Sequence, residues 1–255
     1  MRYFLRLAFN GTPFHGWQIQ PNAVSVQEVL EDALSTVLRD KISVVGAGRT
    51  DTGVNARVMY AHFDVPEPIA DRRRFLLSLS RLCGRDIAVA DVLRVADDAH
   101  ARFDATEREY RYFVAFEKSP FLPFCWFSPS RLDVEEMNAA AALLRDTEDF
   151  TSFAKLHSDA RTNICDVREA GWSEWKNDYG VPGIVFKIRA DRFLRNMVRA
   201  VVGTLVDVGR GHISMDGFGE IVCARDRCAA GTSMPPQALF LWDISYPGSV
   251  FDSVP

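Results

Sequence analysis

The sequence predicts an α+β fold built around a largely antiparallel β-sheet. Its 255 residues, 47% hydrophobic and 25% charged, are typical of a soluble globular protein with one large domain or two modest ones. Patterns typical of strands and helices follow one another as β-α-β-β-α-β and then as β-α-β-β-α-α-β. The strands are short and few helices separate them, whereas a doubly wound parallel sheet needs a helix in each crossover.

In the first half of the chain, the most distinct element is a helix over residues 26–38. Ser25 and Glu28 form an S-x-x-E capping box, and apolar residues follow at helical spacing. Strands are expected where apolar and polar residues alternate, or where β-branched and aromatic residues gather. The other elements expected here are strands at 3–9, 42–45, 54–65 and 87–95 and a helix at 72–82.

The second half opens with an expected strand at 110–116, in which tyrosine, valine and phenylalanine occupy every second position. Asp133 and Glu136 predict the start of a helix. Further strands are expected at 167–175, 184–190 and 239–244, and further helices at 194–208 and after Ser214. The boundary between the two sets of elements lies within 99–109, so we expect an N-terminal half at 1–104 and a C-terminal half at 105–255.

The net charge and the local charges point to different partners. Thirty basic residues against 34 acidic ones give a net charge of −4, which argues mildly against a nucleic-acid partner. Five basic residues nevertheless lie between 187 and 199, against the single acid Asp191. Three of them, Arg192, Arg195 and Arg199, have the spacing of one helical face. A second cluster at 72–74 consists of three arginines. Each cluster is compatible with a phosphate-binding surface or with a solvated face.

The sequence predicts a cytoplasmic protein without a membrane segment. No run approaches the ~18–20 apolar residues of a membrane helix, and arginines at positions 2 and 6 interrupt any signal peptide. The five cysteines contain no C-x-x-C and indicate reduced thiols. The five histidines have no metal-ligand spacing, so no metal site is expected.

A glycine-rich loop follows the strand expected at 42–45. The strand and the G-x-G of Gly46 and Gly48 resemble the start of a dinucleotide fingerprint, which would indicate an oxidoreductase with a nicotinamide or flavin cofactor. The fingerprint requires a third glycine where Asp51 stands, and a helix where a strand is expected. A carboxylate at that place would also repel the pyrophosphate, so this interpretation is disfavoured.

The loop is better explained as a presenter of Asp51. Glycines at 46, 48 and 53 permit tight backbone turns. Thr50 and Thr52 are expected to donate hydrogen bonds to the acid, and Arg49 brings a positive charge near it. An ionised carboxylate in this setting suits nucleophilic attack or general base catalysis. The alternative is an aspartate that only closes the turn through its own backbone.

Four groups of motifs resemble the tRNA pseudouridine synthase A family, and they run through nearly the whole chain. The segment 46–56, GAGRTDTGVNA, is similar to the catalytic motif of that family. The other motifs are FHGWQIQ at 14–20 with SVQ at 25–27, FDA at 103–105 with REYRY at 108–112, and FLRNMVR at 193–199 with VGTL at 202–205. The sequence departs from the family pattern at Ser80, at Gly84 and over 235–238.

The resemblance implies two pseudo-related α+β halves with mainly antiparallel sheets joined around a central active-site cleft. It implies that Asp51 is the catalytic aspartate, that Tyr110 is the active-site tyrosine and that Arg199 is the arginine that pairs with the aspartate. The implied reaction converts uridine to pseudouridine at nucleotides 38, 39 and 40 in the anticodon stem-loop of tRNA, with no cofactor or metal. The family acts as a homodimer.

Further substrate contacts are expected from Arg49, Arg195, Phe14 and His15, the last two by stacking near RNA. Two alternatives stay open at this point: Tyr110 as a core aromatic residue and Arg199 as part of a surface salt bridge. For the whole chain, the alternative function is that of a non-catalytic tRNA-binding module or chaperone on the same fold.

Overall fold

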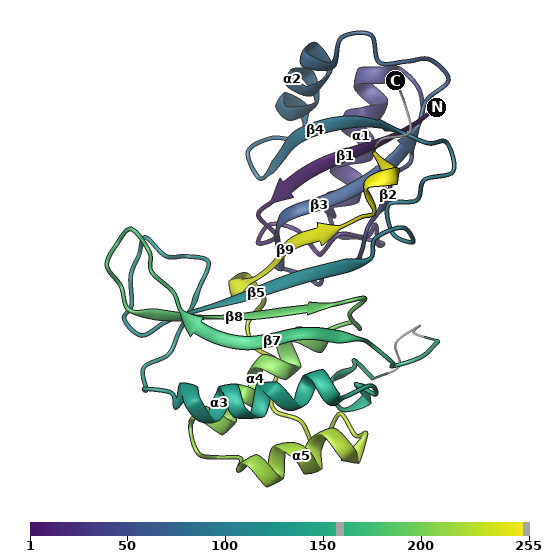
Figure 1. Cartoon of the computed structure of the whole chain (residues 1–255). Coiled ribbons are helices and arrows are strands. Elements are labelled where there is room, and N and C mark those ends of the chain that lie inside the picture. The colour runs from purple at the N-terminus through teal and green to yellow at the C-terminus, as the bar shows by residue number, and fades with distance from the viewer. Residues whose placement is uncertain (157–160, 252–255) are drawn as a thin grey trace. The chain divides into compact units, whose positions relative to one another are not determined.

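A computed structural model describes residues 1–156 and 161–251, so His157 lies outside the described part of the chain. The chain forms two compact units, drawn in Figure 1. Unit 1 contains Met1–Glu107 and the chain from Leu241 onwards, and unit 2 contains Arg108–Phe240. Both units are α+β with mostly antiparallel strands, which confirms the predicted class.

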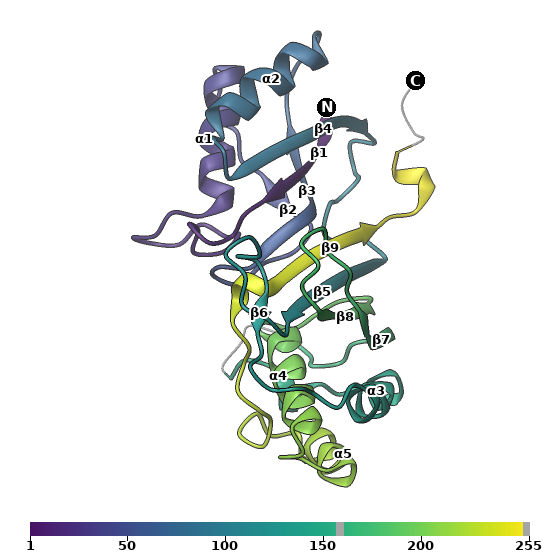
Figure 2. The same ribbon diagram turned by 90° about the vertical axis from the view of Figure 1, so that its left-hand side faces the viewer.

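Unit 1 is a sheet with two helices on one face (Figure 2). Its strands have the order β4-β1-β3-β9, and β2 also pairs with β3. The pairs β1–β3, β1–β4 and β2–β3 are antiparallel. The elements are β1 (Arg2–Phe9), α1 (Val26–Leu38), β2 (Val45–Gly46), β3 (Asn55–Asp64), α2 (Arg72–Leu82), β4 (Ile87–Val95) and β9 (Leu239–Ser245).

Helix α1 forms where the capping signal predicts it. The Ser25 hydroxyl accepts a hydrogen bond from the backbone N–H of Glu28 at 3.2 Å, and the Glu28 carboxylate accepts one from the Ser25 N–H at 3.4 Å. Val26, Leu30 and Leu34 lie on the buried face of the helix, at helical spacing. The cap satisfies backbone donors that the first turn leaves open, and the apolar face fixes the helix on the sheet.

Unit 2 has the strand order β5-β8-β7, with short β6 paired parallel to β5 and its helices on one face of the sheet (Figure 1). Helix α4 is buried almost throughout its length and forms the centre of this unit. The elements are β5 (Glu107–Ala115), β6 (Trp126–Phe127), α3 (Val134–Ala142), β7 (Val167–Glu174), β8 (Gly183–Ala190), α4 (Met197–Gly209) and α5 (Met215–Ala224), with short 3₁₀ turns between some of them.

The structure differs from the sequence prediction in one strand and one helix. Only Val45–Gly46 forms a strand where 42–45 was expected. The helix expected from 194 begins at Met197, because Asn196 adopts a left-handed backbone with φ of 65°. Consequently Arg192 and Arg195 precede the helix and do not share a helical face with Arg199.

The last strand belongs to unit 1, whereas the expected C-terminal half ran over 105–255. From Leu241 onwards, β9 lies beside β3. The ring of Tyr246 packs against Phe4 and Tyr60, with centroid distances of 5.6 and 5.2 Å. Its hydroxyl donates to the Ala101 carbonyl. These contacts join the two ends of the chain within one hydrophobic core.

No helix in the described part of the chain is long and apolar enough to cross a membrane.

His62 is a titratable group buried in the core of unit 1. It lies on β3, and its Nδ1 atom accepts a hydrogen bond from the Ala101 N–H at 3.1 Å. Burial, together with the nearby Arg2 guanidinium and the His100 imidazole, lowers the pKa of His62 to about 4. The folded protein therefore holds this ring neutral under conditions in which an exposed histidine takes up a proton.

We predict that acidification from about pH 6.5 to about pH 4 lowers the free energy of unfolding by on the order of 2–3 kcal/mol through His62. In this window the unfolded chain binds a proton that the folded chain does not. The stability is therefore present above pH 6.5 and is lost as the pH falls. Urea denaturation at several pH values measures the slope. His62→Asn keeps an acceptor for Ala101 without titrating, and identical slopes for both proteins would refute the assignment.

Candidate active site

Asp51 lies in the loop that connects β2 to β3, within unit 1. The side chain is partly exposed, and the backbone carbonyl accepts a hydrogen bond from the Val54 N–H at 3.1 Å. Gly53 has a φ of +77°, a left-handed conformation that favours glycine. The turn that ends at β3 thus directs the chain so that Asp51 is presented at the surface of the unit.

The segment 11–17 holds this loop through its backbone. The Trp17 N–H donates to the Thr50 carbonyl at 3.2 Å, and the Gly53 N–H donates to the Phe14 carbonyl at 3.3 Å. Gly16 has a φ of +87°, and a β-carbon there would lie 2.5 Å from the Thr50 oxygen. The close approach of two backbones fixes the residues on either side of Asp51.

Helix α1 and the Trp17 indole complete the support. The Gln27 N–H donates to the Trp17 carbonyl at 2.9 Å, and the Gln27 amide donates to the Val44 carbonyl at 3.1 Å. The indole covers Gly46 so closely that a β-carbon there would lie 2.5 Å from it. Trp17, 3% exposed, is therefore a core anchor. Gln27 thus connects helix α1 to Trp17, which precedes the helix, and to Val44, which follows it.

The groups expected around Asp51 differ in their exposure. Arg49 and His15 are exposed, whereas Phe14 is only 7% exposed and packs inside the unit. The Thr50 hydroxyl is buried, and it has no hydrogen-bond partner among the described residues. The expected hydrogen bond from Thr50 to Asp51 is thus absent, because the backbone clamp turns the threonine side chain inward.

In unit 2, Tyr110 lies on β5 opposite Ile188 of β8. Its ring is partly exposed and meets the ring of Phe193 edge to face, with centroids 5.0 Å apart. Tyr112, two residues further on the same face, is fully buried and donates to the Pro235 carbonyl at 3.1 Å. Tyr110 therefore stands at the margin of a core to which Tyr112 belongs.

Arg199 lies in the first turn of α4 and is tied to the segment 231–234. Its Nε donates to the Met234 carbonyl at 2.6 Å, and its own carbonyl accepts from the Met234 N–H at 3.1 Å. Gly203 allows this segment to approach, since any β-carbon there would overlap the Thr232 carbonyl. The Thr204 hydroxyl accepts from the Gly231 N–H at 2.9 Å. The VGT part of the last motif thus fixes Arg199.

Two of the basic residues between 187 and 199 are paired with acidic residues. Lys187 lies 2.9 Å from Glu169 and 3.9 Å from Glu109. Arg189 pairs with the same two acids, at 3.8 and 3.5 Å. These strand residues alternate with buried isoleucine and phenylalanine, so they lie on the opposite face of the sheet. There the two glutamates offset their positive charges. Arg195 is exposed in the connection before α4.

The candidate residues therefore fall into two groups. Unit 1 carries Asp51, Arg49, Phe14 and His15, and unit 2 carries Tyr110, Arg195 and Arg199. The described residues contain no group of three or more histidine, cysteine, aspartate or glutamate side chains able to hold a metal. The sequence did not reveal the supporting roles of Gln27, Thr204 and Asn55, although all three stand within the quoted motifs. The Asn55 side-chain oxygen accepts a hydrogen bond from the Gly11 N–H at 2.8 Å.

Comparison with known proteins shows the family to which the chain belongs. The family model described as tRNA pseudouridine synthase matches residues 140–247. tRNA pseudouridine synthase A of Parabacteroides distasonis is 52% identical over 251 residues, covering 98% of each chain. The chain belongs to the tRNA pseudouridine synthase A family. The Bacteroides fragilis member is 50% identical over 252 residues and the Bacillus subtilis member 39% over 252 residues.

The match to tRNA pseudouridine synthase A spans both units. The match to the Bacteroides fragilis relative covers 98% of this chain and 98% of the relative. The match to the Bacillus subtilis relative covers 96% of this chain and 99% of the relative. A solved structure of an unknown protein from Galdieria sulphuraria aligns with 83% of this chain at only 10% sequence identity and a TM-score of 0.22. Family membership therefore rests on the sequence matches.

We predict that Thr50→Val raises the free energy of unfolding by about 1 kcal/mol, because it removes a buried hydroxyl that has no partner while keeping the side-chain shape. Urea denaturation measures the change. Thr204→Val is the matched control. It removes a hydroxyl that donates to the Ala200 carbonyl at 2.9 Å and accepts from Gly231, and it should lower the stability by about 1–3 kcal/mol. Equal destabilisation by both changes would contradict the assignment.

Proposed function

We propose that this chain isomerises uridine to pseudouridine in tRNA, at nucleotides 38, 39 and 40 of the anticodon stem-loop. The observation that carries the proposal is Asp51, presented by a backbone-clamped loop in a chain that belongs to the tRNA pseudouridine synthase A family. The reaction breaks the N1–C1′ bond of the uridine and forms a C5–C1′ bond. The C5 proton leaves and N1 gains one, so the step is balanced without a co-reactant.

Asp51 is the catalytic group in this proposal. An ionised carboxylate can attack the nucleotide or accept its proton, and positive charge from Arg49 and Arg199 favours the ionised form. A uridine within a stem must leave its stack to reach the carboxylate, at a cost of a few kcal/mol. The partly exposed ring of Tyr110 offers a flat face for the displaced base and a phenol for its C5 proton.

The two groups of residues act together in this proposal. Unit 1 supplies Asp51, and unit 2 supplies Tyr110 and Arg199, across a central cleft between two pseudo-related halves. In this proposal His15 and Arg195, both exposed, contact the RNA. The active form is a homodimer, and the reaction takes place in the cytoplasm, where the five free cysteines stay reduced.

The first prediction from this function concerns the aspartate. Asp51→Asn keeps the shape of the side chain but cannot ionise, so pseudouridine formation should fall by at least about 1000-fold. The measurement is pseudouridine content of an unmodified tRNA transcript, with tRNA binding recorded in parallel. Asp32→Asn, on the exposed side of α1, is the control and should keep the wild-type rate. A wild-type rate for Asp51→Asn would refute the proposal, and binding without reaction by the unaltered chain would favour the non-catalytic alternative.

A second prediction separates turnover from folding. Arg199→Ala should lower kcat by about 100-fold or more, because its charge supports Asp51, while removing one hydrogen bond to Met234 costs only about 1–2 kcal/mol of stability. Single-turnover kinetics and urea denaturation give the two numbers. Arg199→Lys retains the charge and should recover part of kcat. A loss of rate that follows the loss of stability would contradict this role.

A further inference from the structure

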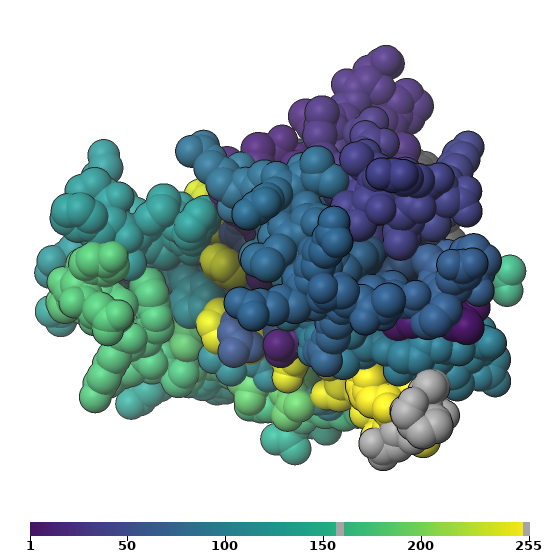
Figure 3. Space-filling model, turned by 90° about the horizontal axis from the view of Figure 1, so that it is seen from above, coloured from purple at the N-terminus to yellow at the C-terminus, as the bar shows by residue number. Residues whose placement is uncertain are grey.

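Helix α2 carries a strongly basic exposed face that the proposed reaction does not use. Between residues 71 and 85 the chain has five arginines against the single acid Asp71, although its net charge is −4. Arg73, Arg74 and Arg81 are all exposed. Figure 3 looks onto the end of unit 1 where the side chains of α2, in blue, lie at the surface.

These three arginines differ from Arg72 and Arg85, which are paired, in having no partner among the described residues. Arg72 pairs with Asp91, and Arg85 lies 3.6 Å from Asp86. The guanidinium groups of Arg73, Arg74 and Arg81 make no ion pair or hydrogen bond with any described residue. We call these three side chains the arginine face. Their charges are not used to stabilise unit 1.

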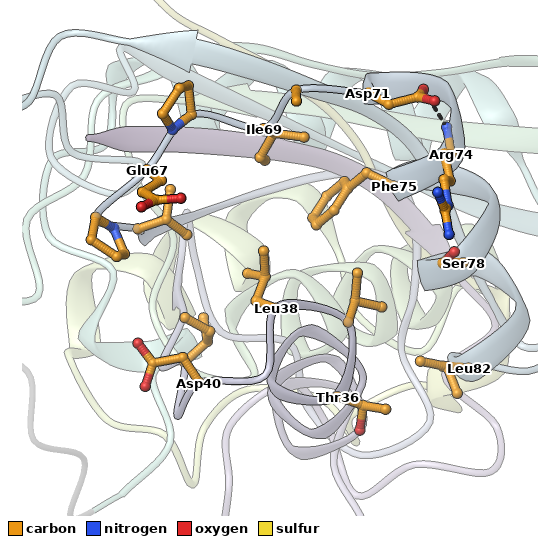
Figure 4. Close-up of a pocket in the computed structure, with 16 residues that line it drawn as sticks. Thr36, Leu38, Asp40, Glu67, Ile69, Asp71, Arg74, Phe75, Ser78 and Leu82 are labelled. Atoms are coloured by element: carbon orange, nitrogen blue, oxygen red, sulfur yellow. Dashed lines mark hydrogen bonds between the residues drawn. The ribbon is translucent and has the colours of Figure 1, made fainter.

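The arginine face borders a hollow on the surface of α2. A cavity of about 400 Å³ is lined by Asp71, Arg73, Arg74, Leu77, Ser78 and Arg81. Figure 4, which draws a neighbouring pocket that shares Asp71, Arg74 and Ser78 with this cavity, shows Arg74 and Ser78 next to each other along the helix. The Asp71 carboxylate, the acid of this cavity, accepts a hydrogen bond from the backbone N–H of Arg74 at 2.9 Å. The side-chain donors that line the cavity are the three exposed guanidinium groups and the half-buried Ser78 hydroxyl, which suit an anion.

The position of these arginines is unfavourable for the helix itself. Arg72, Arg73 and Arg74 fill the first turn of α2, where the helix dipole is positive and acidic residues are preferred. The first turn contains no acid after the cap. The ion pair with Asp91 accounts for Arg72, but folding alone gives no reason for the two further cations at 73 and 74. Binding of a polyanion does, because it offsets both the dipole and the mutual repulsion.

We propose that the arginine face binds the phosphate backbone of the substrate tRNA, outside the site of reaction; this rests on the proposed function. The planar guanidinium fork matches phosphate oxygens, and RNA presents such groups at regular intervals. Arg73 and Arg81 stand two helical turns apart, with Arg74 beside them, so they can contact more than one phosphate.

The sheet register separates this surface from the loop that carries Asp51. Phe9 pairs with Ala56 at the start of β3, and Arg6 pairs with both Tyr60 and Asp91. Asp91, the partner of Arg72, therefore lies about 16 Å from Ala56 by ordinary strand spacing. The arginine face thus contributes to tRNA affinity without contacting the reacting uridine.

The test is the salt dependence of tRNA binding by the full-length protein. The triple variant Arg73→Gln, Arg74→Gln and Arg81→Gln keeps good helix formers and removes three positive charges. We expect the Kd for an unmodified tRNA transcript to rise by about tenfold or more at low salt, and the slope of log K against log salt to become shallower by about 2 to 3. The kcat at saturating tRNA should stay at the wild-type value.

Arg145→Gln is the matched control, because Arg145 is exposed on the 3₁₀ turn after α3 and also makes no ion pair with a described residue. Its changes in Kd and in slope should each be smaller than one third of the changes seen in the triple variant. An unchanged Kd and slope in the triple variant would overturn the proposal and point to an acidic protein as the ligand. Because binding is read separately from pseudouridine formation, failure of the reaction would be distinguished from failure of this surface.

Discussion

The candidate active site depends on the backbone clamp between the segment 11–17 and the loop that carries Asp51. Two hydrogen bonds, from Trp17 to Thr50 and from Gly53 to Phe14, hold the loop on both sides of the aspartate. Glycines at 16 and 46 permit the approach, and the Trp17 indole closes it from one side. Because the clamp uses main-chain groups, it fixes the path of the loop independently of the exposed side chains. Those side chains remain available for RNA.

Unit 2 applies the same principle to Arg199. The segment 231–234 runs against α4 where Gly203 has no side chain, and Met234 exchanges two hydrogen bonds with Arg199. In both units a glycine on one segment admits the backbone of another, and a candidate site residue, Asp51 or Arg199, stands beside the contact. Such preorganisation reduces the conformational freedom that a catalytic group loses when substrate binds.

Much of this fold follows from local sequence signals. The capping residues Ser25, Asp133 and Ser214 mark helix starts as predicted, and the alternation in β4 gives its bounds. Asn196 shows where such reasoning ends, because its left-handed backbone interrupts a continuous helical pattern. The motif around Asp51 was recognisable by resemblance. The inward turn of Thr50 was not, since it results from hydrogen bonds between segments distant in the sequence.

The placement of β9 in unit 1 has a consequence for synthesis on the ribosome. Unit 2 is a continuous stretch of chain, but unit 1 needs the residues from Leu241 onwards to cover β3. Until β9 has been synthesised, β3 lacks this neighbour and leaves backbone groups unpaired along part of that side. The N-terminal unit, although its first residues are made before those of unit 2, is therefore completed only after unit 2 has been made.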